Sequence, residues 1–167
     1  MRVVQLDKNA GGKDLRDACN RQGKVRCVLL PRRVRDTATD PEVVELGAKN
    51  RRLTLTFDKG FFASASHRLA GDHSGVLLLR EDDGSLRQMS TRTAPAFLTN
   101  FKDDFGDEWH SIPWNNCVVE LTPTLIYLYY TRTSPSTKVM VKRDERGWQD
   151  KLRSYLRENA KMLPKRP

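Results

Sequence analysis

The stretch LTLTFDKGFF (53–62) decides the fold, because a strand pattern runs directly into a carboxylate. Leucine and threonine alternate up to Phe57, and residues of this kind favour extended structure. Asp58 ends the run, and Lys59 and Gly60 separate it from two phenylalanines. An acid at such a position suits a turn residue, a helix cap or a metal ligand, so the rest of the chain has to distinguish these roles.

Apolar runs typical of strands alternate with helical patterns through the first half of the chain. We expect strands at 2–6, 25–30, 52–57 and 75–80, and helices at 11–23, 40–50 and 61–70. This alternation predicts βαβ units, and therefore an α/β domain with a mostly parallel sheet and helices on both faces. The run VLLL within the last strand is typical of a parallel strand that is buried on both faces.

The second half of the chain is less regular. The expected elements are a turn at 81–85, a helix after Pro95 within 93–105, a loop at 106–116, strands at 117–121 and 124–132 joined by a turn at Thr122 and Pro123, and an amphipathic helix at 144–162. We therefore assign 1–132 to the α/β domain, 133–143 to a linker or irregular segment, and 144–167 to a basic C-terminal helix and tail.

Composition favours one basic domain with an anionic partner. The chain has 167 residues, a formal net charge of +9 and an isoelectric point near 9.7. Lysine and arginine bind nucleic acid through counterion release, so RNA or DNA is the leading partner, and a merely basic surface is the alternative.

The expected location is the cytoplasm. No apolar run is long enough to span a membrane, and the apolar part of the N-terminus is too short for a signal peptide. The cysteines are odd in number and far apart, at Cys19, Cys27 and Cys117, which favours reduced thiols over a disulfide framework.

Acidic residues follow three of the expected strands. Asp7 follows the first strand, Asp40 lies beyond the second, and Asp58 follows the third. The carboxyl ends of parallel strands meet at one edge of a sheet, where ligands of open α/β sheets bind. Clustered carboxylates repel one another, and two or three of them with open positions form a typical Mg²⁺ or Mn²⁺ site that can activate water for phosphodiester cleavage.

Basic residues accompany these acids and could bind the flanking phosphates of RNA: Arg32, Arg33, Arg35 and Lys59. Each feature also has a structural alternative. Asp40 suits the N-cap of a helix with Pro41 at its first position, Asp58 suits an Asx-type turn, and Asp7 could cap the helix after Gly12. The arginines could equally form a solvated loop.

The order of these motifs resembles the compact PIN-like nuclease families. The segments that carry the resemblance are VVQLDKN (3–9), TDPEVVELGAKN (39–50), RRLTLTFDKGFF (51–62) and HSGVLLLR (73–80). The resemblance covers 2–80 well and extends more loosely to about residue 132. It implies a three-layer α/β/α fold with a mostly parallel sheet, to which the C-terminal helix is an addition.

The resemblance also implies a ribonuclease that depends on Mg²⁺ or Mn²⁺. Asp7, Asp40 and Asp58 would be its metal ligands and catalytic acids, and Asn9 and Thr56 would support them. A fourth acid is common in these families, and Asp36 and Glu42 are the candidates here. Phe61 would pack beneath the site, whereas Lys8 and Gly60 stand where relatives often carry acids.

The leading hypothesis is therefore a metal-dependent endoribonuclease. Many relatives are toxins of bacterial toxin–antitoxin pairs, so the expected partners are RNA, an antitoxin protein and a second copy of the chain. The alternatives are a non-catalytic nucleic-acid-binding module on a degenerate PIN-like scaffold and a phosphoacceptor signalling domain.

Two further features of the second half have open roles. The aromatic residues Trp109, Trp114, Tyr129 and Tyr130 could stack on bases or pack in the core. The C-terminal helix could pack on the domain through Trp148 and Leu152, or it could dock a partner or RNA.

Overall fold

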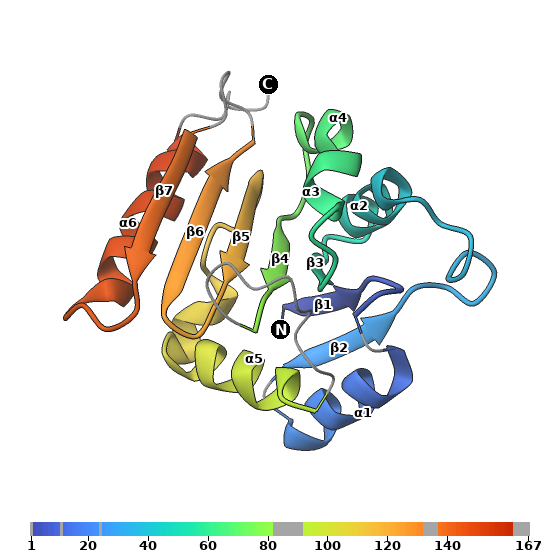
Figure 1. Cartoon of the computed structure of the whole chain (residues 1–167), viewed down its shortest axis with the longest axis horizontal. Helices are drawn as coiled ribbons and strands as arrows, with labels where there is room; N and C mark the ends of the chain where they lie inside the picture. Colours follow the sequence, from blue (N-terminus) through green and yellow to red (C-terminus); the bar gives the residue numbers. More distant parts are fainter. Residues whose placement is uncertain (1, 11, 24, 82–91, 132–136, 162–167) are drawn as a thin grey trace.

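The computed structural model describes residues 2–10, 12–23, 25–81, 92–131 and 137–161, and it has the expected α/β architecture (Figure 1). The strands are β1 (Val3–Leu6), β2 (Arg26–Leu29), β3 (Leu53–Thr56), β4 (Val76–Leu79), β5 (Cys117–Leu121), β6 (Leu125–Tyr130) and β7 (Thr137–Lys142). The helices are α1 (Gly12–Gln22), α2 (Asp40–Lys49), α3 (Phe61–Ser64), α4 (Ser66–Leu69), α5 (Ala94–Asp103), the 3₁₀ helix η1 (Gly106–His110) and α6 (Trp148–Lys161).

One sheet holds all seven of these strands, in the order β2-β1-β3-β4-β5-β6-β7. Strands β1 to β5 pair in parallel, and β6 and β7 add two antiparallel pairings. The predicted mostly parallel sheet is thus confirmed. Because β1 and β3 are neighbours, with Leu6 paired to Leu55, the residues that follow these two strands emerge side by side.

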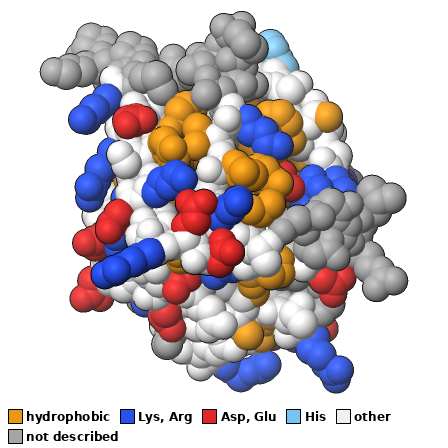
Figure 2. All heavy atoms as spheres, turned by 60° about the vertical axis from the view of Figure 1, so that its left-hand side comes forward, with side chains coloured by type: hydrophobic (Ala, Val, Ile, Leu, Met, Phe, Trp, Pro, Cys, Tyr) orange, Lys and Arg blue, Asp and Glu red, His pale blue; other side chains and the backbone are white. Residues whose placement is uncertain are grey.

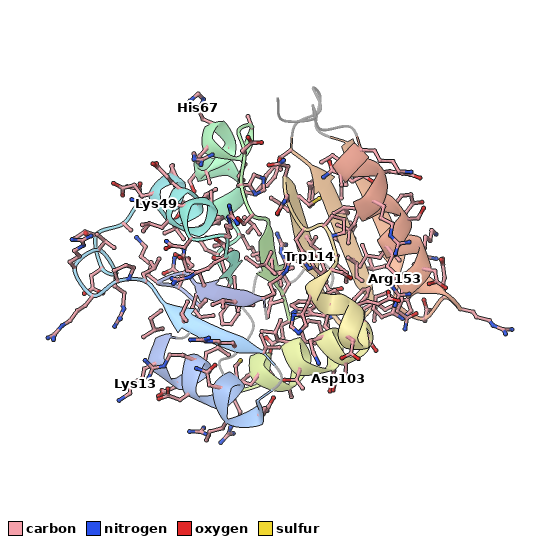
Figure 3. The ribbon with its side chains drawn as sticks, turned by 180° about the vertical axis from the view of Figure 1, so that it is seen from behind. Lys13, Lys49, His67, Asp103, Trp114 and Arg153 are labelled. Atoms are coloured by element: carbon pink, nitrogen blue, oxygen red, sulfur yellow. The ribbon has the colours of Figure 1, made fainter. Side chains whose placement is uncertain are left out.

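Helices pack on both faces of the sheet, as predicted for three layers. Alternate strand residues enter two separate cores: Leu6 and Leu55 join the core beneath α1, α5 and α6, whereas Val76 and Val118 join the core beneath α2, α3 and α4. Trp114 belongs to the first of these cores and is labelled near the middle of the molecule in Figure 3.

Helix α2 approaches β3 closely because it carries Gly47. A Cβ atom at this position would lie 2.6 Å from Oγ1 of Thr54 and 3.2 Å from the backbone oxygen of Arg52. Gln5, on β1, donates from Nε2 to the backbone oxygen of Val43 at 3.1 Å. These contacts fix α2 against the sheet and so determine where its first residue, Asp40, lies.

Three elements differ from the sequence-based prediction. The helix expected at 61–70 is two four-residue helices, α3 and α4, which meet at Ala65. The loop expected at 106–116 begins with η1. Strand β7 lies within 133–143, the segment interpreted as a linker, and it pairs with β6 along its whole length. The turn expected at 81–85 lies outside the described residues beyond Glu81.

The C-terminal helix packs on the domain. Trp148, Leu152 and Leu156 of α6 are buried in the same core as α1 and α5, and Tyr130 on β6 donates its hydroxyl to the backbone oxygen of Tyr155 at 2.8 Å. This contact surface favours the packing role of α6 over a free docking helix.

Two further expectations can be checked on the described residues. Cys19, Cys27 and Cys117 are free and buried, as predicted from their number and spacing. Within the described part of the chain, no helix combines the length and apolar character needed to cross a bilayer.

Candidate functional site at the carboxyl ends of β1 and β3

Asp7 is a buried carboxylate at the end of β1, with an exposed fraction of 1%. Its Oδ2 accepts a hydrogen bond of 3.0 Å from the hydroxyl of Thr56, the last residue of β3. Its Oδ1 accepts the backbone N–H of Lys8 at 2.7 Å. Groups from β3 and from the residue after Asp7 therefore hold this acid from two sides.

Asp58 is joined to Asp7 through the same threonine. The backbone N–H of Asp58 donates to Oγ1 of Thr56 at 3.1 Å, so one buried hydroxyl serves both acids. Oδ1 of Asp58 accepts the N–H of Gly60 at 2.7 Å, which is the Asx-type turn predicted as an alternative. Oδ2 accepts Nδ2 of Asn9 at 3.3 Å. The turn thus holds one oxygen of Asp58 while the other points toward the residues that follow β1.

Asp40 is the first residue of α2 and not its N-cap, so the prediction of Asp40 as N-cap and Pro41 as the first helical residue is wrong. Thr39 is the N-cap, because Glu42 reaches back to accept its backbone N–H at 2.7 Å and its hydroxyl at 2.9 Å. Asp40 therefore does not act as the N-cap of α2. Its Oδ2 accepts a hydrogen bond from the hydroxyl of Ser64 in α3.

Electrostatics couple Asp7 to Asp40. Burial is the main cause that raises the pKa of Asp7 above its ordinary value, and the charge of Asp40 raises it further. The Thr56 hydroxyl and nearby backbone N–H groups act in the opposite direction. The causes that shift the pKa of Asp7 are burial, hydrogen bonds and the charge of Asp40, and they include no cationic side chain.

The donor set suits a hard divalent cation. Mg²⁺ is commonly held by one or two carboxylates together with water and substrate phosphates, and Asp7 and Asp58 can supply such a pair. The described residues contain no group of three or more His, Cys, Asp or Glu side chains that could hold a metal ion. Thr56 thus links the carboxylate of Asp7 to the backbone N–H of Asp58, the charge of Asp40 acts on Asp7, and the described residues do not bring all three carboxylates together as one metal-binding group.

Among the described residues, the other two acids predicted for the site form no hydrogen bond with Asp7 or Asp58. Asp36 is exposed in the loop before α2. The carboxylate of Glu42 is engaged with Thr39, and these hydrogen bonds lower its pKa.

The basic residues predicted to bind phosphate are of two kinds. Arg32 and Arg33 are exposed in the loop after β2, where a ligand can reach them. Arg35 is half-buried and donates to the backbone oxygen of Leu30 at 3.1 and 3.3 Å, which makes it a loop-fixing residue. Lys59 is half-buried beside Asp58.

Sequence reasoning missed two contacts that shape this edge. Lys8 donates from Nζ to the backbone oxygen of Ala38 at 3.2 Å and so ties the end of β1 to the loop before α2. Ser64 ties α3 to Asp40. Neither contact has a sequence signal, because each joins segments more than twenty residues apart.

The aromatic residues that could stack on bases are mostly core residues. Trp109 and Trp114 are fully buried and Tyr130 is 4% exposed, whereas Tyr129 is only half-buried. Tyr129 alone among the four remains accessible to a ligand.

Comparisons with known proteins do not assign the chain to a family. No family model, no curated protein and no solved structure matches the chain. The resemblance to PIN-like nucleases stays a prediction from the motifs, and the functional argument depends on the chain's own residues.

Proposed function

We propose that the protein is a divalent-metal-dependent endoribonuclease whose reactive edge is formed by Asp7 and Asp58. The observation that carries the proposal is the buried Asp7, whose carboxylate accepts the Thr56 hydroxyl that also accepts the backbone N–H of Asp58, and whose pKa is raised by burial. Burial of a charge is costly, and acids with perturbed pKa values cluster at functional sites.

Each residue has a role in the proposal. Asp7 and Asp58 hold Mg²⁺ or Mn²⁺, Thr56 orients the first acid, and Asn9 orients the second. When bound, the ion supplies a Lewis acid that neutralises charge on phosphate oxygens and activates water. The exposed Arg32 and Arg33 bind phosphates that flank the scissile bond.

The test is cleavage of a labelled single-stranded RNA with Mg²⁺, with Mn²⁺ and with EDTA. We expect cleavage with either metal, none with EDTA, and a loss of at least about 100-fold in rate in Asp58→Ala, since these acids would act on the transition state. Asp14→Ala removes an exposed acid on α1 and should cleave like the parent. A folded parent that cleaves no RNA with either metal would end the proposal, as would full activity in Asp58→Ala.

A second candidate is a non-catalytic nucleic-acid-binding module. The observation that favours it is that the described residues contain no group of three or more acidic, histidine or cysteine side chains that could hold a metal ion. It predicts salt-sensitive RNA binding that does not change with Mg²⁺ or Mn²⁺ and no cleavage in any buffer.

A further inference from the structure

The sheet face beneath α2, α3 and α4 continues beyond these helices onto β6 and β7. Pairing of β5 with β6 sets Glu120 opposite Tyr127, and pairing of β6 with β7 sets Tyr127 opposite Met140. The same pairings set Tyr129 opposite Lys138 and Leu125 opposite Lys142. Directly paired residues share a face, so these side chains form rows on one surface. Tyr127, Tyr129, Lys138, Met140 and Lys142 are called the β6–β7 face below.

The β6–β7 face reaches solvent. Met140 is 47% exposed and is the exposed large hydrophobic residue of the described chain, Lys138 and Lys142 are exposed, and the two tyrosines are half-buried. Helix α6 packs on the opposite side of these strands, where Val141 is buried. Figure 2, which brings the β7 side forward, shows hydrophobic side chains at the surface with Lys and Arg side chains among them.

The ammonium group of Lys138 lies over the rings of two half-buried tyrosines. Nζ of Lys138 is 4.1 Å from the ring centroid of Tyr127 and 5.4 Å from that of Tyr129. Cation–π contacts at exposed sites are weak, so the ammonium can leave the ring for a phosphate when a base stacks there. A half-exposed ring beside a mobile ammonium has the two parts of a single-strand site, a stacking surface and a phosphate ligand.

The second ring is held in place. The hydroxyl of Tyr129 donates to Oε2 of Glu120 at 3.2 Å, and Oε1 of Glu120 forms an ion pair of 2.8 Å with Arg80. The same carboxylate contributes to a pKa of about 12 for Tyr129, after burial. A fixed ring loses little conformational freedom on binding, which favours its use as a stacking platform.

The β6–β7 face adjoins α3, the helix that follows Asp58 in the chain. The ring of Phe62 in α3 lies 5.1 Å from that of Tyr129, and α3 begins three residues after Asp58. Lys142 pairs with Leu125 at the start of β6, which lies at the same edge as the carboxyl end of β5. The contact with Phe62 thus places the β6–β7 face beside the helices that follow Asp58.

We propose that the β6–β7 face binds single-stranded RNA by base stacking on Tyr127 and Tyr129, with phosphates at Lys138 and Lys142. The choice of RNA as the nucleic acid rests on the proposed function. Charge complementarity favours this occupant, because the exposed positions beside the rings are lysines in a chain of net charge +9. A second copy of the chain is disfavoured, since a two-fold contact would set these lysines against one another.

The experiment measures binding of a fluorescein-labelled, mixed-sequence 12-nucleotide RNA by anisotropy in EDTA, which separates binding from cleavage. Tyr127→Leu should weaken binding roughly 5- to 100-fold, whereas the matched Tyr127→Phe keeps the ring and should bind like the parent. The same sequence as a duplex should bind less tightly than the single strand, because paired bases cannot reach the rings.

The lysines are tested by the salt dependence. Removing two phosphate contacts with the Lys138→Ala/Lys142→Ala double variant should reduce the slope of log K against log salt by about 1.4. Lys13→Ala removes an exposed lysine on α1 and should change neither the slope nor the affinity appreciably.

Several results would overturn the inference: no binding by the folded parent, equal affinity in Tyr127→Leu and Tyr127→Phe, or a parent dimer that Met140→Asp dissociates. The last result would assign the face to a second copy. The two proposals can be contradicted separately. Binding of RNA through Tyr127 without any cleavage contradicts only the proposed nuclease activity. Active cleavage with full affinity in Tyr127→Leu contradicts only the β6–β7 face.

Discussion

Replacing Thr56 with valine keeps the shape of the side chain and removes only its hydroxyl. That hydroxyl is fully buried, donates to the Asp7 carboxylate at 3.0 Å and accepts the Asp58 N–H at 3.1 Å. Loss of a hydrogen bond to a charged group costs about 1.5–3 kcal/mol, and the part-buried N–H of Asp58 also loses its partner. We expect Thr56→Val to lower the free energy of unfolding by about 3 kcal/mol.

The matched control is Thr56→Ser, which keeps the hydroxyl and loses one methyl group, at a cost of about 1 kcal/mol. Urea unfolding of the three proteins measures the difference, and the melting temperature of Thr56→Val should fall by roughly 6–12 °C. The pKa of Asp7, followed by NMR of its carboxyl carbon, should rise in Thr56→Val because the hydroxyl stabilises the charged form. Equal stability of the valine and serine variants would refute the role given to this hydroxyl.

Three further predictions concern a buried histidine, the packing of α2 and the binding of metal. Burial lowers the pKa of His73 to about 4 from 6.5, so its protonation favours the unfolded chain and stability is lost as the pH falls from 6.5 toward 4. Urea unfolding at pH 5 and pH 8 should show about 2 kcal/mol of this loss in the parent and little of it in His73→Gln. Gly47→Ala should destabilise the fold by about 1 kcal/mol although alanine favours helices, because its Cβ meets Thr54 Oγ1 at 2.6 Å, and Thr54→Ala should relieve this cost in a double-mutant cycle. Saturating Mn²⁺ at about 100 times its Kd should stabilise the parent by about 2.7 kcal/mol in thermal unfolding and leave Asp58→Ala unchanged.

Much of the architecture could be predicted from local patterns. The run VLLL that became β4 is apolar and buried at every position, as its pattern indicates, and Gly23 follows α1 where the expected helix ends. Parallel pairing then sets Asp7 and Asp58 at one edge without knowledge of any tertiary contact.

Other features depend on tertiary contacts or on competing local signals. Thr39 and Asp40 are both good N-cap residues, and the contact from Glu42 decides between them. In strand β7 (TKVMVK) the valines alternate with Lys138, Met140 and Lys142, a pattern of a half-exposed edge strand beside a proline-containing break. The hydroxyl of Thr56 was expected to support the site, yet only the structure reveals that it serves both acids.

The β6–β7 face could not be predicted from the sequence. Tyr127 and Met140 face solvent because no described helix continues over β6 and β7 on that side, a property of layer arrangement that strand patterns do not encode. Trp109 and Trp114 are more prominent in the sequence, yet both are buried in the core instead.

The central claim is that Asp7 and Asp58 together hold a divalent cation. Anomalous diffraction from crystals grown with MnCl₂ tests it most directly, using the parent and Asp58→Ala. The account predicts a manganese peak between the Asp7 and Asp58 carboxylates of the parent and no peak there in the variant. An ordered site without manganese in the parent, or a peak that persists in Asp58→Ala, would contradict it.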